Sequence, residues 1–229
     1  MTIWTIVVAA GRGERFGGDK QAADLGGRPV VAHSVATAMR ASDGVVVVVA
    51  AERLDEAEVL LAEAEAEAEA DGVLAVVDGG ATRSDSVRSG LAAVPDDAEV
   101  ILVHDGARPL ASDALFARVV AAVKAGADAV VPGVPVADSL RAIDGSVVDR
   151  DGVIAVQTPQ GFSAHRLRSA HAAGGDASDD ATLVEAAGGT VVVVDGEVAN
   201  LKITRPVDLA LAATLKVGDD GANRGGAGV

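Results

Sequence analysis

Short runs of β-branched apolar residues recur along the chain and alternate with longer segments that suit helices. The apolar runs predict buried strands at 3–9, 45–50, 73–77, 100–103, 129–131 and 191–194. The intervening segments predict helices at 29–40, 54–70, 84–94, 113–125, 164–173, 179–187 and 206–215. Strand and helix in alternation predict an α/β fold, in which a mostly parallel sheet has helices on both faces.

Residues 62–70, AEAEAEAEA, alternate with the period of a strand. Because Ala and Glu favour helices and disfavour strands, we expect a helix with a solvated acidic face there.

The alternation of strand and helix breaks between Gly133 and Thr158. Short β-like pieces are separated there by Asp-Gly pairs at 144/145 and 151/152, and Asp-Gly is a hairpin signal. We therefore expect one domain over 1–215 with an inserted β-arm at about 133–158. The segment 216–229 holds five glycines in fourteen residues and is expected to be a disordered tail.

Composition narrows the class of protein. Hydrophobic residues make up 49% of the 229 residues and aromatic residues 2%, so the core must consist of Val, Ala, Leu and Ile. Cysteine is absent, which excludes disulfides, thiolate metal sites and cysteine nucleophiles. The first apolar run is too short to span a bilayer and lacks a preceding basic region, which predicts a cytoplasmic protein.

The charge is strongly negative overall but unevenly spread. The formal net charge of −15 disfavours a general nucleic-acid or membrane surface, so a polyphosphate ligand would need a local basic pocket. Residues 51–72 carry nine acids and one base, whereas residues 1–40 carry five bases and three acids. An anion site is therefore expected near the N-terminus.

The segment AAGRGERFGGDKQ, residues 9–21, follows the first strand directly. Gly11 and Gly13 permit positive φ and close backbone approach, so amides can cradle phosphate oxygens. Arg15 and Lys20 add cations suited to charge on a phosphoryl group. The segment is neither a dinucleotide fingerprint nor a Walker A motif, and a plain turn is the alternative.

A second segment, DGGATRSDSVRSGL, residues 78–91, also runs from a strand end into a helix. Gly79 and Gly80 can approach a planar base, and Ser86 can direct a hydroxyl toward it. Helix capping by Ser84 or Asp85 is the structural alternative.

Further candidates lie at the end of the fourth predicted strand and beyond it. Asp105 and Arg108, in VHDGARPL, stand where open α/β sheets bind ligands, although a structural ion pair would fit as well. Taken alone, Asp138, Ser139, Arg150 and Thr158 suit turns and surfaces. Either Ser178 or Asp179 suits a helix N-cap, and Pro206, after Lys202, suits the first position of a helix.

These blocks, in this order, resemble the 2-C-methyl-D-erythritol 4-phosphate cytidylyltransferase family, over about residues 3–215. The resemblance implies a Rossmann-like α/β sheet, a projecting β-arm that makes a homodimer, and the transfer of a cytidylyl group from CTP to methylerythritol phosphate with release of pyrophosphate. It further implies a divalent cation, Mg²⁺, bound with CTP mainly through phosphate oxygens and water. No protein ligand for the ion is assigned beyond Asp105 as a candidate, and the four histidines lack ligand spacing.

The resemblance also implies a role for each candidate residue. The implied catalytic residues are Arg15 and Lys20, at the α-phosphate, and Arg150 and Lys202, which position the attacking phosphate. The implied nucleotide-binding residues are Ala9, Ala10, Gly11, Gly13, Gly79, Gly80, Ser86 and Asp105. The implied acceptor-binding residues are Asp105, Arg108, Ser139, Thr158 and Ser178, and Ser139, Arg150 and Thr158 would come from the partner's arm.

The chain departs from the family pattern at a few positions. Asp19 stands where a proline usually precedes the lysine, and an adjacent carboxylate is expected to compete for Lys20. Gly106 replaces alanine, and Ser139 and Ser178 replace threonines while keeping a hydroxyl.

The chemistry implied is simple, because a phosphate monoester is already an anionic nucleophile and needs no general base. A ribitol 5-phosphate cytidylyltransferase and a non-catalytic nucleotide-binding relative remain the alternatives. An NAD-dependent oxidoreductase is disfavoured, because Ala50 and Ala51 follow the second strand where an acidic ribose ligand is needed.

Overall fold

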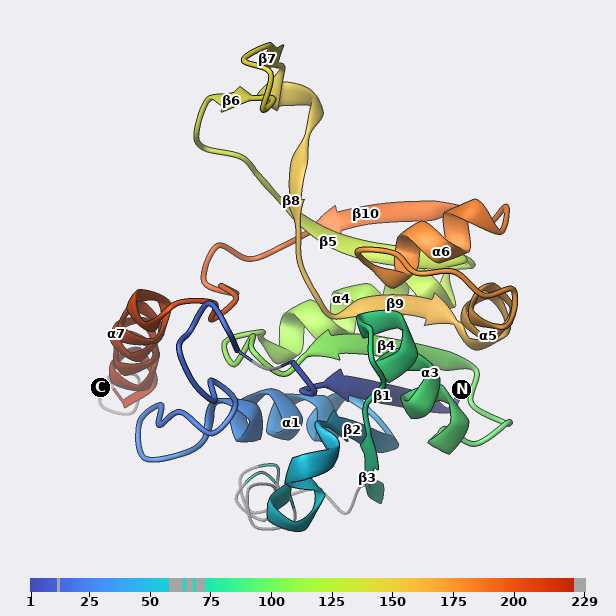
Figure 1. The fold of residues 1–229 in the computed structure, drawn as a ribbon, viewed down its shortest axis with the longest axis horizontal. Helices are drawn as coiled ribbons and strands as arrows, with labels where there is room; N and C mark the ends of the chain where they lie inside the picture. Colours follow the sequence, from blue (N-terminus) through green and yellow to red (C-terminus); the bar gives the residue numbers. More distant parts are fainter. Residues whose placement is uncertain (12, 58–63, 65–67, 69–72, 225–229) are drawn as a thin grey trace, which may run out of the picture.

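The fold is built on a single eight-stranded sheet (Figure 1). The computed structural model describes residues 1–11, 13–57, 64, 68 and 73–224. The strand order is β10-β5-β9-β4-β1-β2-β3, and β8 pairs with β5 outside this path. The strands are β1 (Ile3–Val8), β2 (Gly44–Val49), β3 (Val73–Asp78), β4 (Val100–Asp105), β5 (Ala129–Pro135), β8 (Ile154–Val156), β9 (Gln160–Ser163) and β10 (Val191–Asp195).

The central strands are parallel, as the alternation of strand and helix predicts. Strand β1 pairs in parallel with both β2 and β4, β2 pairs in parallel with β3, and β10 pairs in parallel with β5. All six residues of β2 and all six of β4 are buried. Val-rich strands covered on both faces explain these continuous apolar runs.

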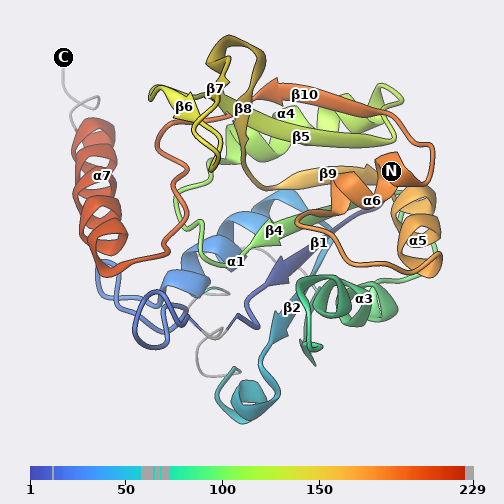
Figure 2. The same ribbon diagram turned by 45° about the horizontal axis from the view of Figure 1, so that its top comes forward.

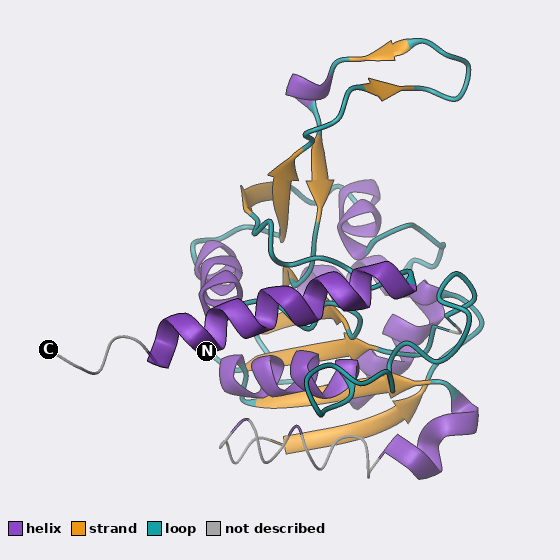
Figure 3. Cartoon of the chain, turned by 90° about the vertical axis from the view of Figure 1, so that its left-hand side faces the viewer, coloured by secondary structure: helices purple, strands orange, loops and turns teal. Residues whose placement is uncertain are grey.

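Helices cover both faces of the sheet (Figure 3). Alternate strand residues separate the core into two layers, so Val7 packs with α1 (Val30–Ala41) and α4 (Asp113–Lys124). Ile6 packs in the opposite layer with α3 (Arg83–Ala93), α5 (Ala164–Ala172) and α6 (Asp180–Ala186).

Strand β9 was not predicted from the sequence. It lies antiparallel between β4 and β5 and is buried over Gln160–Phe162. Its sequence, QGFS, shows neither an apolar run nor alternation. A Cβ at Gly161 would lie 2.5 Å from Cγ1 of Val119, so a residue without a side chain is needed for α4 to pack here.

The arm predicted at about 133–158 projects from the sheet (Figures 1 and 3). Strands β6 (Leu140–Arg141) and β7 (Val147–Val148) form a two-stranded antiparallel sheet in it. The Asp144-Gly145 pair makes the expected hairpin turn, with Gly145 at φ +89°. The Asp151-Gly152 pair lies instead in a 3-10 turn, η2 (Arg150–Gly152).

The helix boundaries agree with the sequence except at two places. The helix expected at 54–70 lies mostly outside the described residues; a 3-10 turn, η1 (Ala51–Arg53), leads into it, and Leu54–Ala57 is helical. Helix α7 (Pro206–Arg224) starts at Pro206 as predicted but runs beyond Leu215, so residues 216–224 are helical where a disordered tail was expected. Figure 2 shows α7 beside the sheet, away from the arm. Among the described residues, no helix has the length and apolar character required to cross a membrane.

Candidate active site

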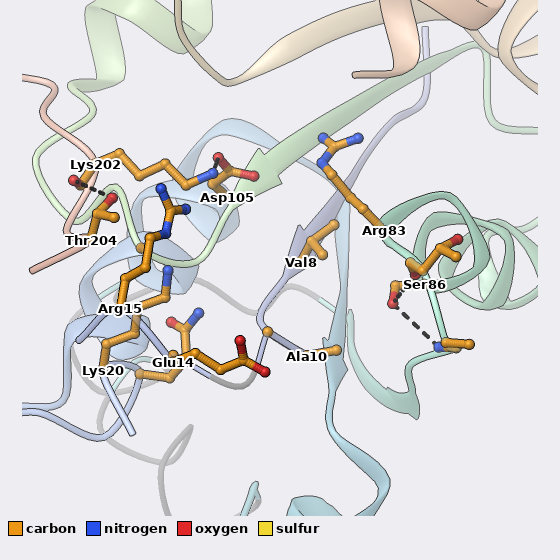
Figure 4. Close-up of a pocket in the computed structure, with 17 residues that line it drawn as sticks. Val8, Ala10, Glu14, Arg15, Lys20, Arg83, Ser86, Asp105, Lys202 and Thr204 are labelled. Carbon is orange, nitrogen blue, oxygen red and sulfur yellow. Dashed lines mark hydrogen bonds and ion pairs between the residues drawn. The ribbon is translucent and has the colours of Figure 1, made fainter. Parts of the chain in front are cut away.

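A pocket of about 750 Å³ lies at the carboxyl ends of the central strands (Figure 4). Open α/β sheets bind ligands at this edge, because loops from neighbouring strands meet there. Nine predicted residues line the pocket: Ala10, Gly11, Gly13, Arg15, Lys20, Gly80, Ser86, Asp105 and Lys202. The side chains that line it carry four cations and two carboxylates, in a chain with a net charge of −15. The basic pocket expected near the N-terminus is therefore present.

The loop after β1 folds back on itself at one glycine. Gly13 has φ +63°, and a Cβ there would collide with the carbonyl oxygen of Gly18. Its own carbonyl accepts from the amides of Phe16 at 2.8 Å and Gly17 at 3.1 Å. Gly11 behaves differently from the expectation, because its φ is not positive and a Cβ there would meet open space. Gly11 instead leaves the backbone of the pocket wall uncovered by a side chain.

The carboxylate of Asp19 does not compete for Lys20, contrary to the expectation. Its Oδ2 lies 2.7 Å from Nη1 of Arg53, and its Oδ1 accepts from the amide of Gln21 at 3.0 Å. Lys20 instead donates to the carbonyl oxygen of Ile203 at 3.3 Å. Asp19 thus closes the turn that carries Lys20.

Several charges act on Lys20. Burial lowers the pKa of its ammonium, and the cations of Lys202 and Arg15 lower it further, while Asp105 opposes them. Lys20 is therefore half-buried and close to two other cations. A phosphate group entering this space would meet three cations together.

The second wall of the pocket comes from the turn between β3 and α3. Ser86 Oγ accepts from the amide of Gly80 at 3.2 Å and donates to the carbonyl of Thr82 at 3.0 Å, so its hydroxyl organises the turn. A Cβ at Gly79 would lie 2.5 Å from Cβ of Ala10, so the two loops touch only because Gly79 has no side chain. Gly79 and Ala9 support the wall from behind and do not line it.

The cap of α3 differs from the sequence prediction of Ser84 or Asp85. Thr82 is the N-cap residue, and Asp85 is the third helical residue, whose carboxylate accepts from the amide of Thr82 at 3.1 Å. This is a capping box, so Asp85 takes part without being the cap. At α6, the N-cap is Asp179 rather than Ser178.

Asp105 lies at the centre of the site, at the end of β4. Its Oδ2 is 2.7 Å from Nζ of Lys202 and 3.8 Å from Nε of Arg108. Burial raises its pKa, but the positive charges of Lys202, Arg83 and Arg108 outweigh burial, so the pKa falls to about 2. Asp105 is therefore a carboxylate at neutral pH.

Arg108 and Thr158 contact Asp105 but do not line the pocket. Arg108 donates to the carbonyl of Asn200 at 2.7 Å, and burial lowers its pKa against the pull of Asp105. Thr158 Oγ1 accepts from the amide of Asp105 at 3.0 Å and lies 3.1 Å from Nδ1 of His104. Because Thr158 is buried in the body of its own chain, the expectation that it is lent across an interface is wrong.

Ser139, Arg150 and Ser178 lie outside the pocket of their own chain. Ser139 and Arg150 are exposed on the arm, where Arg150 donates to the carbonyl of Ala137 at 2.6 Å. Ser178 is exposed just before α6. One chain alone therefore does not bring these residues to the phosphate-binding cations.

Sequence reasoning missed eight residues that line the pocket: Val8, Glu14, Gln21, Ala81, Thr82, Arg83, Ala107 and Thr204. Arg83 is the most informative of them, because it places a cation in the first turn of a helix that follows a glycine pair at a strand end. This position in the sequence could have identified Arg83 as a site residue. Burial lowers its pKa, but the carboxylates of Asp180 and Asp105 more than compensate, so the pKa is raised.

A glycine-rich loop and four cations at the carboxyl edge of a parallel sheet define a nucleotide-binding α/β protein of the kind that transfers phosphoryl or nucleotidyl groups. The comparisons with known proteins are more specific. The family model described as 2-C-methyl-D-erythritol 4-phosphate cytidylyltransferase matches residues 3–216. The chain belongs to this family, as its resemblance predicted.

Individual relatives agree with this assignment. A 2-C-methyl-D-erythritol 4-phosphate cytidylyltransferase from Nocardia farcinica is 45% identical over 93% of this chain and 94% of its own length. One from Rhodococcus opacus is 46% identical over 92% of this chain and 93% of its own length.

Solved structures show the same fold. The 2-C-methyl-D-erythritol 4-phosphate cytidylyltransferase from Thermus thermophilus has a TM-score of 0.77 and 37% identity, covering 94% of this chain and 98% of that one. A 4-diphosphocytidyl-2C-methyl-D-erythritol synthase from Anaerococcus prevotii has a TM-score of 0.79 and 30% identity, covering 93% and 97%.

Proposed function

We propose that the protein transfers the cytidylyl group of CTP to 2-C-methyl-D-erythritol 4-phosphate, releasing pyrophosphate and giving 4-diphosphocytidyl-2-C-methyl-D-erythritol. The observation that carries the proposal is the gathering of Arg15, Lys20, Arg83 and Lys202 around one pocket in a member of this family. The same pocket offers the uncharged wall of Gly80 and Ala81 for a pyrimidine.

The chain's residues then divide the reaction between them. The turn at Gly80 and Ser86 receives cytosine, and the loop at Gly11 and Gly13 receives the triphosphate. Arg15 and Lys20 stabilise the charge that develops on the α-phosphate as the acceptor phosphate attacks in line. No side chain needs to remove a proton, because the attacking phosphate monoester is already an anion.

The acceptor phosphate is assigned to Lys202, with Asp105 at the junction of the two substrates and Arg108 acting on it through Asp105, 3.8 Å away. Lys202 is 40% exposed at its side chain, so it can leave Asp105 and bind phosphate. Ser178 would complete the acceptor pocket.

The rest of the acceptor site is assigned to a second copy of the chain. Ser139 and Arg150 lie on the projecting arm. On the same arm Ile143 is fully exposed and Val147 is 73% exposed. Exposed apolar side chains on a projecting hairpin are compatible with a surface that is buried in an assembly. A homodimer in which the arm reaches the neighbouring site would bring Arg150 to the acceptor phosphate.

The residues of the pocket are compatible with a magnesium ion carried by CTP. Asp105 and Glu14 supply carboxylate oxygens, the ligands that Mg²⁺ prefers, and Asp105 is ionised at neutral pH. Among the described residues, no group of three or more acidic or histidine side chains forms a metal site. The ion would neutralise triphosphate charge, with Asp105 as the candidate protein ligand. The cytoplasmic location expected from the sequence stays a prediction.

A pyrophosphate-release assay tests the proposal. Pyrophosphate should appear only with CTP, a divalent cation and methylerythritol phosphate together, and not with UTP, ATP or GTP. Equal rates with ribitol 5-phosphate would overturn the acceptor assignment. Nucleotide binding without any turnover would support a non-catalytic relative instead.

A further inference from the structure

A buried chain of polar contacts lies behind Arg83. His171 Nε2 is 3.0 Å from Oδ1 of Asp180, and Asp180 Oδ2 accepts from Nη1 of Arg83 at 2.7 Å. The side chain of Asp180 is fully buried, and that of His171 is 3% exposed. The chain therefore connects the interior between α5 and α6 to a residue on the pocket wall.

Arg83 lines the ligand pocket, and its guanidinium also contacts the buried Asp180. Figure 4 shows Arg83 and Ser86 on one side of the pocket and Lys202, Arg15 and Lys20 on the other. Asp180 takes one nitrogen of a planar guanidinium, which has five N–H donors in a fixed fork. A guanidinium held at one nitrogen by a buried carboxylate has fewer orientations available, so less conformational entropy is lost when its remaining donors bind a ligand.

The free-energy cost of burying Asp180 favours a role beyond packing for the contacts between His171, Asp180 and Arg83. A carboxylate taken wholly out of water is costly unless it is paired and hydrogen-bonded, and Asp180 is paired with Arg83 and His171. Apolar residues of similar volume would often stabilise such an interior as well. What they would not do is fix a guanidinium at the pocket wall.

The segment before Asp180 is tied to the same helix. Arg88 donates to the carbonyl of Gly175 at 3.1 Å, and the amide of Ala177 donates to Ser84 Oγ at 3.3 Å. Ser178, the candidate acceptor residue, lies between these contacts and Asp180. The segment that carries Ser178 and the helix that carries Arg83 are therefore held together by hydrogen bonds.

We propose that Asp180 and His171 are positioning residues for Arg83, which they hold in the orientation that receives the nucleotide. The proposal rests on the proposed function for the identity of the nucleotide. It predicts that His171, which lies outside the pocket, affects CTP binding through Arg83 alone.

A double-mutant cycle on CTP binding, measured by calorimetry, tests this directly. His171→Leu removes the donor to Asp180 and should weaken CTP binding by about threefold or more, a coupling expected of residues in one network. Arg83→Ala should weaken binding at least as much. In the Arg83→Ala background, His171→Leu should have no further effect. Additive losses in the double variant would overturn the proposal, because His171 would then act independently of Arg83.

Two further variants separate positioning from stability. His171→Gln keeps an N–H donor and should retain near-parental CTP affinity. Asp180→Asn keeps the volume and one accepting oxygen, and it replaces His171→Leu in the cycle if the leucine variant does not fold. Asp128→Asn is the matched control, since it removes a carboxylate paired with Arg166 at 2.9 Å outside the pocket. CTP binding lost equally in the control would also overturn the proposal.

Pyrophosphate release by the parental protein separates the proposed function from the proposed positioning of Arg83. Absence of pyrophosphate release by the parental chain would refute the proposed function. The coupling between His171 and Arg83 is measured by CTP binding alone, so its test does not depend on turnover.

Discussion

The ammonium of Lys202 lies 2.7 Å from Oδ2 of Asp105, although 97 residues separate them in the sequence. Lys202 follows β10 and Asp105 ends β4, so the pairing depends on the fold and on the backbone bond from the amide of Ile203 to the carbonyl of Ala107 at 2.8 Å. This pair holds together the region where the two substrates should meet.

Replacing Lys202 should impair use of the acceptor. In Lys202→Ala the phosphate loses its assigned cation, and the pKa of Asp105 should rise from about 2 toward its ordinary range. Turnover should fall on the order of a hundredfold, while calorimetry with CTP should show little change. Steady-state kinetics with methylerythritol phosphate varied would reveal the loss. A large loss of CTP affinity with unchanged turnover would refute the assignment.

Lys20→Ala and Arg15→Ala should lower turnover far more than they weaken CTP binding. Both cations are assigned to charge that appears in the transition state, so their loss should cost on the order of a hundredfold or more in kcat. Stopped assays for kcat and calorimetry for CTP affinity separate the two effects. Near-parental turnover with only a raised KM would show that these residues bind the ground state.

If two subunits share each active site, two inactive variants should complement each other in mixed dimers. Arg150→Ala and Lys20→Ala homodimers should both be nearly inactive, and mixing them with subunit exchange should restore about a quarter of parental activity. Random assortment makes about half the dimers mixed, and each mixed dimer has one intact site by two-fold symmetry. Mass spectrometry of tagged chains confirms the exchange. Exchange without recovery would mean that the arm serves its own site.

Acid should destabilise the fold through His104. Burial lowers its pKa from 6.5 to about 4, and this effect outweighs the upward pull of the Asp105 carboxylate and of the carbonyl of Arg108, which lies 3.3 Å from Nε2. The unfolded chain binds a proton near pH 6.5 and the folded one does not, so stability is lost as pH falls from about 6.5 to 4. The loss should be on the order of 3 kcal/mol. Urea unfolding of parental and His104→Asn protein at several pH values would measure it, and equal pH slopes would contradict the prediction.

Asp19 should contribute modestly, through the turn that carries Lys20. Asp19→Ala removes a partly exposed ion pair with Arg53 and a bond to the amide of Gln21, together about 1 kcal/mol of stability. Because Lys20 does not pair with Asp19, its catalytic contribution should persist. Thermal unfolding and kcat measure the two effects. A rise in kcat would show instead that Asp19 restrains Lys20 after all.

The layers of the fold and the first half of the site follow from local patterns in the sequence. Val-rich runs separated by amphipathic segments permit few arrangements, because each strand must be covered on both faces. The loop with Gly13, Arg15 and Lys20 follows its strand directly, so sequence proximity already implied spatial proximity. The Asp144-Gly145 turn was equally local, since the chemistry of the pair sets the backbone.

Features that depend on contacts between distant segments could be found in the folded chain alone. Strand β9 exists because β4, β5 and α4 leave a space that only a chain with Gly161 fills, and no local pattern records that space. Arg83 became a site residue, and Asp180 and His171 its supports, because α3, α5 and α6 pack on one face of the sheet. Burial and charge pairing between remote segments, as for Asp105 and Lys202, arise only when the chain has folded, so the sequence order could not reveal them.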